Sequence, residues 1–128
     1  MKYSKDGRKL LKAPGELSGT YSVKEGTRII CDSAFSFCRS LSEIVIPSSV
    51  TSIGKGAFSY CVSLSEIVIP SSVTSIGKGA FSCCDSLSEI VIPSSVASIG
   101  DSAFYRCKFP DNLKQELIFR FGDKIFSL

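Results

Sequence analysis

LSEIVIPSSVTSIGKGAFSYC, residues 41–61, returns almost letter for letter at residues 64–84 and with modest drift at residues 87–107. The period is 23 residues, the step from Leu41 to Leu64. Recurrence at this spacing predicts stacked structural units that each bury an apolar face against the next unit. A degenerate copy comes first, because the inward positions shifted back by one period remain apolar or small: Tyr21, Val23, Ile30, Ala34, Phe35 and Cys38.

Each repeat predicts two short extended segments followed by a tight turn. Ile44-Val45-Ile46 is a β-branched run that stops at a proline, which is typical of a short strand. Residues 50–53 predict a second extended or turn segment, and Gly54 is expected to let the backbone bend. Residues 57–59 predict a single helical or 3-10 turn that points Phe58 inward.

Stacking these units in a parallel ladder, about 4.8 Å apart, predicts columns of identical side chains. Alternation along the strand puts two isoleucines of each repeat inward and a glutamate and a valine outward. The inward columns are Ile44, Ile67 and Ile90; Ile46, Ile69 and Ile92; and Phe35, Phe58, Phe81 and Phe104. Each buried large side chain contributes roughly 1.5–3 kcal/mol, so four repeats supply ample stabilisation.

The two ends of the chain do not follow the period and predict caps. Residues 1–17 contain an extended start, the Asp6-Gly7 turn signal and a return strand at Leu10, which predicts a β-hairpin. Residues 108–128 predict an amphipathic helix. Its predicted N-terminus is a capping box of Asn112 and Gln115, its apolar face is Leu113, Leu117 and Phe121, and its stop is Gly122. Closing the last repeat is the favoured use of this helix, and docking on a partner is the rival use.

Composition excludes several functional classes. The 128 residues are 44% hydrophobic and 21% charged, with a net charge of +3 that is too small to predict nucleic-acid binding. The basic excess lies within residues 1–30 and is interpreted as a solvated end, with a contact patch for an acidic partner as the alternative. No apolar run reaches the roughly 20 residues of a membrane span. The start has no run typical of a signal peptide, although a signal that had been removed would leave no trace.

The pattern L-x-x-I-x-I-P-x-x-V-x-x-I-G-x-x-A-F-x-x-C resembles the leucine-rich repeat of the BspA-like type, and the match covers residues 18–107. The starting hairpin also resembles the one that opens such arrays. The resemblance implies a non-enzymatic binding protein, many relatives being secreted or displayed on cell surfaces and several thought to be adhesins. This chain differs from them in being short and in lacking a visible signal or anchor.

Catalytic and metal chemistry have little support in the sequence. The chain has no histidine, which removes Ser-His and Cys-His nucleophile pairs and the commonest metal ligand. We predict no catalytic residue, metal or cofactor. Four of the six cysteines recur in one phase, and a straight column does not converge on a tetrahedral zinc site or bridge without distortion, so they are interpreted as buried free thiols: Cys38, Cys61, Cys84 and Cys107.

Cys83 and Cys31 fall outside that column. Cys83 shares its column with Phe37, Tyr60 and Arg106 and is expected to be more exposed than the other cysteines, whereas Cys31 replaces Gly54. An oxidation-prone or dimer-linking thiol at Cys83 is therefore an alternative to an incidental replacement.

The outward strand face is the best candidate for a binding site. Packing explains the inward residues but does not explain an acidic ladder beside a valine stripe, where like charges lie one strand apart. The predicted partner-binding residues are Ser42, Glu43, Val45, Ser65, Glu66, Val68, Ser88, Glu89 and Val91. Such a face suits a basic, partly apolar partner or a second copy of the chain. Duplication of the repeats without selection on their surface is the competing explanation.

The sequence thus predicts one β-dominated α/β solenoid over residues 1–128. It is a leucine-rich-repeat array of parallel short strands, with a hairpin cap at 1–17, four repeats at 18–107 and a helical cap at 108–128. The predicted function is a protein-protein interaction module that binds another protein or itself through the strand face. A self-associating scaffold and a thiol redox protein using Cys83 or Cys31 remain open alternatives. The partner, the oligomeric state and the compartment stay undetermined, and only the resemblance favours the cell surface.

Overall fold

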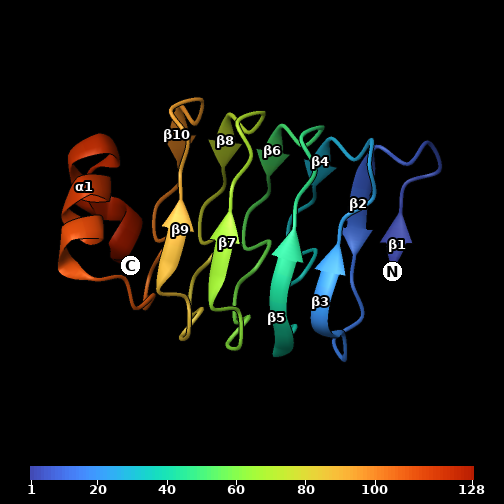
Figure 1. Cartoon of the computed structure of the whole chain (residues 1–128), viewed down its shortest axis with the longest axis horizontal. Coiled ribbons are helices and arrows are strands. Elements are labelled where there is room, and N and C mark those ends of the chain that lie inside the picture. Colours follow the sequence, from blue (N-terminus) through green and yellow to red (C-terminus); the bar gives the residue numbers. More distant parts are fainter.

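The computed structural model describes all residues 1–128 and shows a solenoid with two rows of short parallel strands (Figure 1). One row contains β3 (Ser18–Ser22), β5 (Ser40–Val45), β7 (Glu66–Val68) and β9 (Glu89–Val91). The other contains β2 (Lys9–Lys12), β4 (Ile29–Ile30), β6 (Ser52–Ile53), β8 (Ser75–Ile76) and β10 (Ser98–Ile99). The prediction of a β-dominated repeat solenoid is confirmed.

The continuous sheet is formed by the row of β4, β6, β8 and β10, which the sequence predicted only as extended or turn segments. Its six strands run β1-β2-β4-β6-β8-β10, and β1 (Lys2–Tyr3) pairs antiparallel with β2. The row that carries Ile44-Val45-Ile46 was expected to form an unbroken ladder, and this was wrong. That row consists of two separate pairs, β3-β5 and β7-β9.

One contact distinguishes the repeat beside the break between β5 and β7. Glu43 accepts a hydrogen bond from the hydroxyl of Thr20 at 2.9 Å, across the ladder of β3 and β5. Repulsion between like charges does not explain the break, because Glu66 and Glu89 lie directly opposite each other in the intact ladder of β7 and β9. The break falls between the second and third repeats, beside the glutamate that β3 engages.

The core follows the predicted columns. All four phenylalanines of the inward column are fully buried, and their rings stack with centroids 5.0, 5.2 and 5.6 Å apart and planes within 9° of parallel. Phe109 and Phe126 pack against Phe104 at the end of the column. Residues 57–59 form a turn rather than a helix, and Phe58 points inward as predicted.

The glycine column has a role different from the one predicted. Gly54, Gly77 and Gly100 do not adopt a left-handed conformation. A Cβ at Gly77 would lie 2.6 Å from the backbone nitrogen of Lys55 in the preceding repeat. These glycines are needed because neighbouring repeats approach too closely for a side chain, not because the chain must bend there.

The two ends are covered by different elements. The hairpin closes through a turn in which the amide of Gly7 donates to the carbonyl of Ser4 at 2.9 Å, and Leu10 is fully buried. At the other end lie α1 (Asp111–Phe121) and the 3-10 helix η1 (Asp123–Phe126). Figure 1 places α1 beside β9 and β10.

The details of the helix differ in part from the prediction. The capping box was wrong: α1 begins after Pro110 without a side-chain cap. Pro110 is extended and cannot continue the helix backwards, so the start is set by its backbone. Leu117 is buried, with Leu113 and Phe121 packed partly against the core, and Gly122 ends the helix at a φ of 87°. With 11 residues, α1 is too short and too polar to cross a membrane.

Candidate interaction surface

The outward residues of β5, β7 and β9 form one exposed strip along the sheet face, which we call the sheet-face strip. The valines of the strip are 51, 64 and 61% exposed at Val45, Val68 and Val91. Direct pairing of Glu66 with Glu89 and of Val68 with Val91 holds two of the three repeats in register. All nine predicted residues are exposed: Ser42, Glu43, Val45, Ser65, Glu66, Val68, Ser88, Glu89 and Val91.

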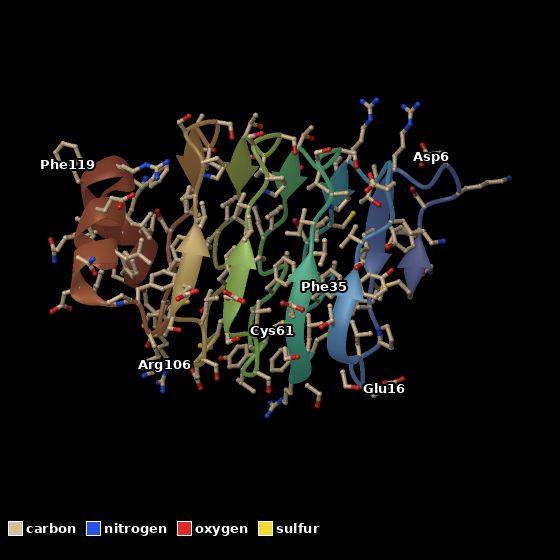
Figure 2. All side chains as sticks on the ribbon, viewed as in Figure 1. Asp6, Glu16, Phe35, Cys61, Arg106 and Phe119 are labelled. Atoms are coloured by element: carbon tan, nitrogen blue, oxygen red, sulfur yellow. The ribbon has the colours of Figure 1, made fainter.

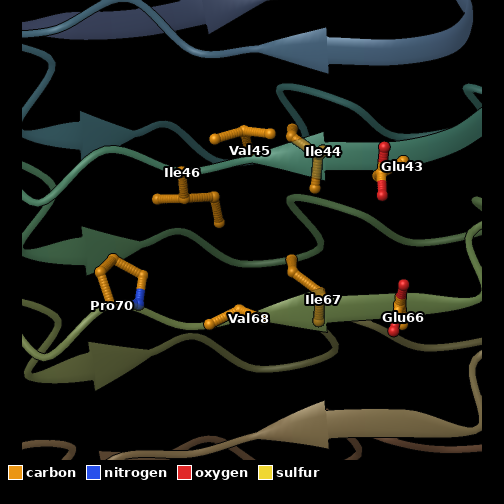
Figure 3. Close-up of a pocket in the computed structure, with 8 residues that line it drawn as sticks. All are labelled: Glu43, Ile44, Val45, Ile46, Glu66, Ile67, Val68 and Pro70. Carbon is orange, nitrogen blue, oxygen red and sulfur yellow. The ribbon is translucent and has the colours of Figure 1, made fainter.

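A groove opens in the strip where the ladder is interrupted. It encloses about 340 Å³ between β5 and β7. Two glutamates and two valines of the strip line it: Glu43, Val45, Glu66 and Val68. Its other lining residues are Ile44, Ile46 and Ile67, which the sequence assigned to the inward columns, and Pro70, which follows β7 (Figure 3). The serines of the strip and the residues of β9 lie outside the groove.

Backbone groups on the two sides of this groove lack the bonds that the next pair of repeats makes. Between β7 and β9, the amide of Ser88 donates to Ser65 at 3.1 Å and the amide of Ile69 to Val91 at 3.3 Å. The equivalent bonds from the amides of Ser65 and Ile46 are not formed. The groove therefore offers backbone donors and acceptors as well as apolar side chains. The period alone could not reveal it, because the repeats on both sides have identical strands.

The carboxylates of the strip interact with one another across repeats. A hydrogen bond and the charge of Glu89, with a smaller effect of Glu43, raise the pKa of Glu66 above its usual value. Glu66 therefore holds its proton to a higher pH than an isolated glutamate would. The strip is therefore a source of negative charge at neutral pH whose charge falls as the pH is lowered.

The cysteine column does more than fill space. Each thiol donates to a carbonyl of the preceding unit, for example Cys61 to Phe35 at 3.1 Å and Cys84 to Phe58 at 3.1 Å. Burial raises the pKa of Cys61 to about 12 and that of Cys107 to about 12. All six cysteines are free thiols. Thiols held in the protonated form are poor nucleophiles.

Cys83 is buried at 8% exposure, beside Tyr60 and Arg106, and is thus only slightly more exposed than the fully buried Cys38, Cys61 and Cys84. Cys107 was predicted to be buried like the rest of its column, and this was wrong, because it is partly exposed. Cys31 is partly exposed, and burial raises the pKa of its thiol. Cys83 therefore lacks the accessibility of a redox thiol, and the raised pKa of Cys31 disfavours its reactive thiolate form. No group of three or more Cys, Asp or Glu side chains is arranged to hold a metal ion.

Comparison with known proteins finds a matching repeat family and several similar solved structures. The family described as the BspA type leucine rich repeat region (6 copies) matches residues 19–128. A leucine-rich repeat protein from Bacteroides ovatus has a similar structure, with 36% identity, a TM-score of 0.68 and coverage of 84% of this chain and 29% of its own. The comparison with curated proteins finds no match.

Two further solved structures are similar. A leucine rich cell surface protein from Faecalibacterium prausnitzii shares 28% identity at a TM-score of 0.60, over 95% of this chain and 40% of that one. The pneumococcal vaccine antigen PcpA shares 25% identity at a TM-score of 0.62, over 69% of this chain and 22% of that one. The chain thus spans less than half the length of each of these three proteins.

Proposed function

Because the chain belongs to the family of BspA-type leucine-rich repeat proteins, we propose that it is a non-enzymatic module that binds a partner protein through the sheet-face strip. The observation that carries the proposal is the groove between β5 and β7, which combines exposed valines, unpaired backbone groups and two flanking carboxylates. Apolar contact surface with a charged rim is the composition of protein interfaces.

The chemistry of the strip indicates the kind of partner. Glu43, Glu66 and Glu89 repel acidic surfaces and attract lysine or arginine, whereas the valine row contacts aliphatic side chains. An extended segment that lies along a strand directs residues i and i+2 to the same side. The best partner segment therefore has a basic residue two positions from an aliphatic one.

A cell-surface, adhesin-like role is the finer part of this proposal. Its support is that the similar protein from Faecalibacterium prausnitzii is described as a cell surface protein and PcpA as a vaccine antigen. In that setting the strip would meet a host or neighbouring-cell protein.

The test uses random extended peptides displayed on phage and selected on the wild-type protein. We expect enrichment of Lys or Arg two positions from Val, Ile or Leu, and the selected peptides should bind the double variant Glu66→Lys/Val68→Ser at least about tenfold more weakly. Thermal stability should change little, because both side chains are exposed.

A matched control carries the same charge change away from the strip. Glu25→Lys with Thr74→Ser changes one exposed glutamate and one exposed threonine outside the sheet-face strip, and should leave peptide binding intact. Equal binding of the selected peptides to the strip variant and to the wild type would disprove the sheet-face proposal.

Self-association is the second candidate, favoured by the near identity of the three strand faces. Face-to-face pairing would oppose glutamate rows, so repulsion disfavours it at neutral pH and protonation of the ladder relieves it. Light scattering that shows a monomer at about pH 7 and at about pH 4 would remove this alternative.

A further inference from the structure

Each repeat ends in a tight turn that holds a residue other than glycine in an unfavourable backbone conformation, and in three of the four repeats this residue is large. Phe37, Tyr60, Cys83 and Arg106 have φ values of 63, 60, 61 and 67°, in the left-handed region. Bulky residues with positive φ are genuine outliers, and such strain clusters at binding sites. We call this edge of the solenoid the turn edge, and Figure 2 marks it at Arg106.

A second column of residues in the same repeats also has a left-handed backbone, and it shows which residue types suit this conformation at low cost. It consists only of small residues: Ser33, Gly56, Gly79 and Ser102. Glycine and serine are the low-cost solution there. The turn edge has the same backbone conformation but carries two aromatic side chains and an arginine besides Cys83, so backbone conformation does not explain the three large residues.

The differences between repeats also gather at the turn edge. Residues 41–63 and 64–86 differ at only two positions, where Tyr60 becomes Cys83 and Val62 becomes Asp85. The next repeat departs at the same edge through Tyr105 and Arg106, and elsewhere at Ala97, Asp101 and Ser102. In contrast, the strand faces are identical in all three copies. This edge is therefore the one place where each copy from residue 41 onward differs from the copy before it.

Five residues at these divergent positions converge on one pocket. The pocket encloses about 360 Å³ and is lined by Tyr60, Cys83, Asp85, Tyr105, Arg106 and Leu128. Stacking on Phe37 fixes the Tyr60 ring, with centroids 4.6 Å apart and planes 5° from parallel. Its volume lies at the small end of the roughly 300–1,000 Å³ of ligand pockets, so it suits a single ring.

The polar groups of the pocket have unused bonding capacity. The Asp85 carboxylate and the Arg106 guanidinium take part in neither ion pair of the protein. Neither these groups nor the Tyr105 phenol has a side-chain hydrogen-bond partner. They can therefore bind a ligand without first breaking an internal bond.

The charges exclude several ligand classes. An anion would meet the Asp85 carboxylate, and a cation would meet the Arg106 guanidinium, so a strongly charged ligand of either sign is disfavoured. A wholly apolar ligand would leave both charged groups without partners. A neutral ring with hydroxyls on its rim and C–H groups on its faces suits both charged groups and the aromatic wall. Its hydroxyls can donate to the Asp85 carboxylate and accept from the Arg106 guanidinium, and one of its faces can pack on the ring of Tyr60.

We propose that the turn-edge pocket binds one pyranose ring of a glycan. Tyr60, held by Phe37, is the platform for one face of the sugar. Asp85 accepts hydrogen bonds from sugar hydroxyls, and Arg106 donates to them. The proposal is independent of protein binding through the sheet-face strip.

The test is saturation-transfer NMR with a panel of methyl pyranosides of glucose, galactose, mannose, fucose and N-acetylglucosamine, followed by calorimetric titration of any binder. We expect at least one sugar to bind. Asp85→Asn should weaken binding about tenfold, since hydrogen bonds to charged groups contribute most. Tyr60→Gly should abolish binding while leaving the melting temperature equal or higher, because glycine relieves the left-handed strain.

The strip variant Glu66→Gln is the control and should keep full sugar affinity. The proposal is overturned if no sugar in the panel binds, or if a sugar that binds is retained by both Asp85→Asn and Tyr60→Gly. Loss of binding in Glu66→Gln alone would also overturn it, because the site would then lie on the sheet face.

Discussion

Replacement of Gly77 by alanine probes the closest contact between two repeats. The added Cβ would lie 2.6 Å from the nitrogen of Lys55, 2.7 Å from the carbonyl carbon of Gly54 and 2.9 Å from the Cα of Lys55. All three are backbone atoms, which cannot rotate away as the end of a flexible side chain could. The repeats themselves must separate to make room.

The required separation sets the size of the effect. Ordinary contact begins near 3.4 Å, so the repeats must part by about 0.8 Å. The bond from the amide of Gly77 to Ile53, now 2.9 Å, would lengthen to about 3.7 Å and be lost. Overpacking costs about 1–3 kcal/mol and a lost hydrogen bond about 0.5–1.5 kcal/mol. We therefore expect the free energy of unfolding to fall by about 2–4 kcal/mol.

Urea unfolding followed by far-ultraviolet circular dichroism measures this change. Gly79→Ala is the matched control two residues away. Its φ of 64° makes alanine unfavourable by about 1–2 kcal/mol, but its Cβ would meet only the side chain of Ser82 at 3.9 Å. A loss below about 1 kcal/mol for Gly77→Ala, or a larger loss for Gly79→Ala, would refute the role of close approach.

Three other measurements address the core, the strip and the thiols. Phe58→Ala should lower the free energy of unfolding by about 3–5 kcal/mol, because the ring is fully buried, and a loss under about 1 kcal/mol in urea titration would contradict this. The raised pKa of Glu66 beside Glu89 means that the folded protein binds a proton more tightly than the unfolded chain and gains stability as the pH falls through that pKa. Glu66→Gln should therefore raise the melting temperature at about pH 7 and match the wild type near pH 3, whereas an equal gain at both would argue against the carboxylate pair. In thiol titration of the native protein with Ellman's reagent, Cys31 should react first and Cys61 only on unfolding, and rapid native reaction of Cys61 would show that its burial is misjudged.

The fold was predictable because the same pattern of inward apolar residues recurs several times along the chain. A single Ile-Val-Ile run is ambiguous, but three copies in phase distinguish inward from outward residues. The degenerate first repeat kept Phe35 and Ala34 in that phase, and both are fully buried. The exposure of the predicted strip followed from the same alternation, while its role in binding stays a prediction.

The features that the sequence did not reveal depend on contacts between particular neighbouring repeats. The 23-residue period cannot distinguish these contacts, because it makes all repeats equivalent. The bond from Thr20 to Glu43 belongs to the degenerate repeat, so no comparison of the identical strands could place the ladder break beside β5. The burial of Cys83 depends on its left-handed backbone and on its neighbours in adjacent repeats. The start of α1 depended on the backbone of Pro110 rather than on side-chain capping.

The interrupted ladder gives the two sides of the solenoid different stiffness. Bending that opens the β5–β7 side stretches no strand ladder at that point, whereas bending in the opposite sense must lengthen hydrogen bonds of the sheet through β4, β6 and β8. The continuous sheet therefore acts as a hinge line, and the array is softest in the direction that widens the groove. A ligand seated there would change the curvature of the molecule, which couples occupancy of the groove to the relative orientation of the two ends of the chain.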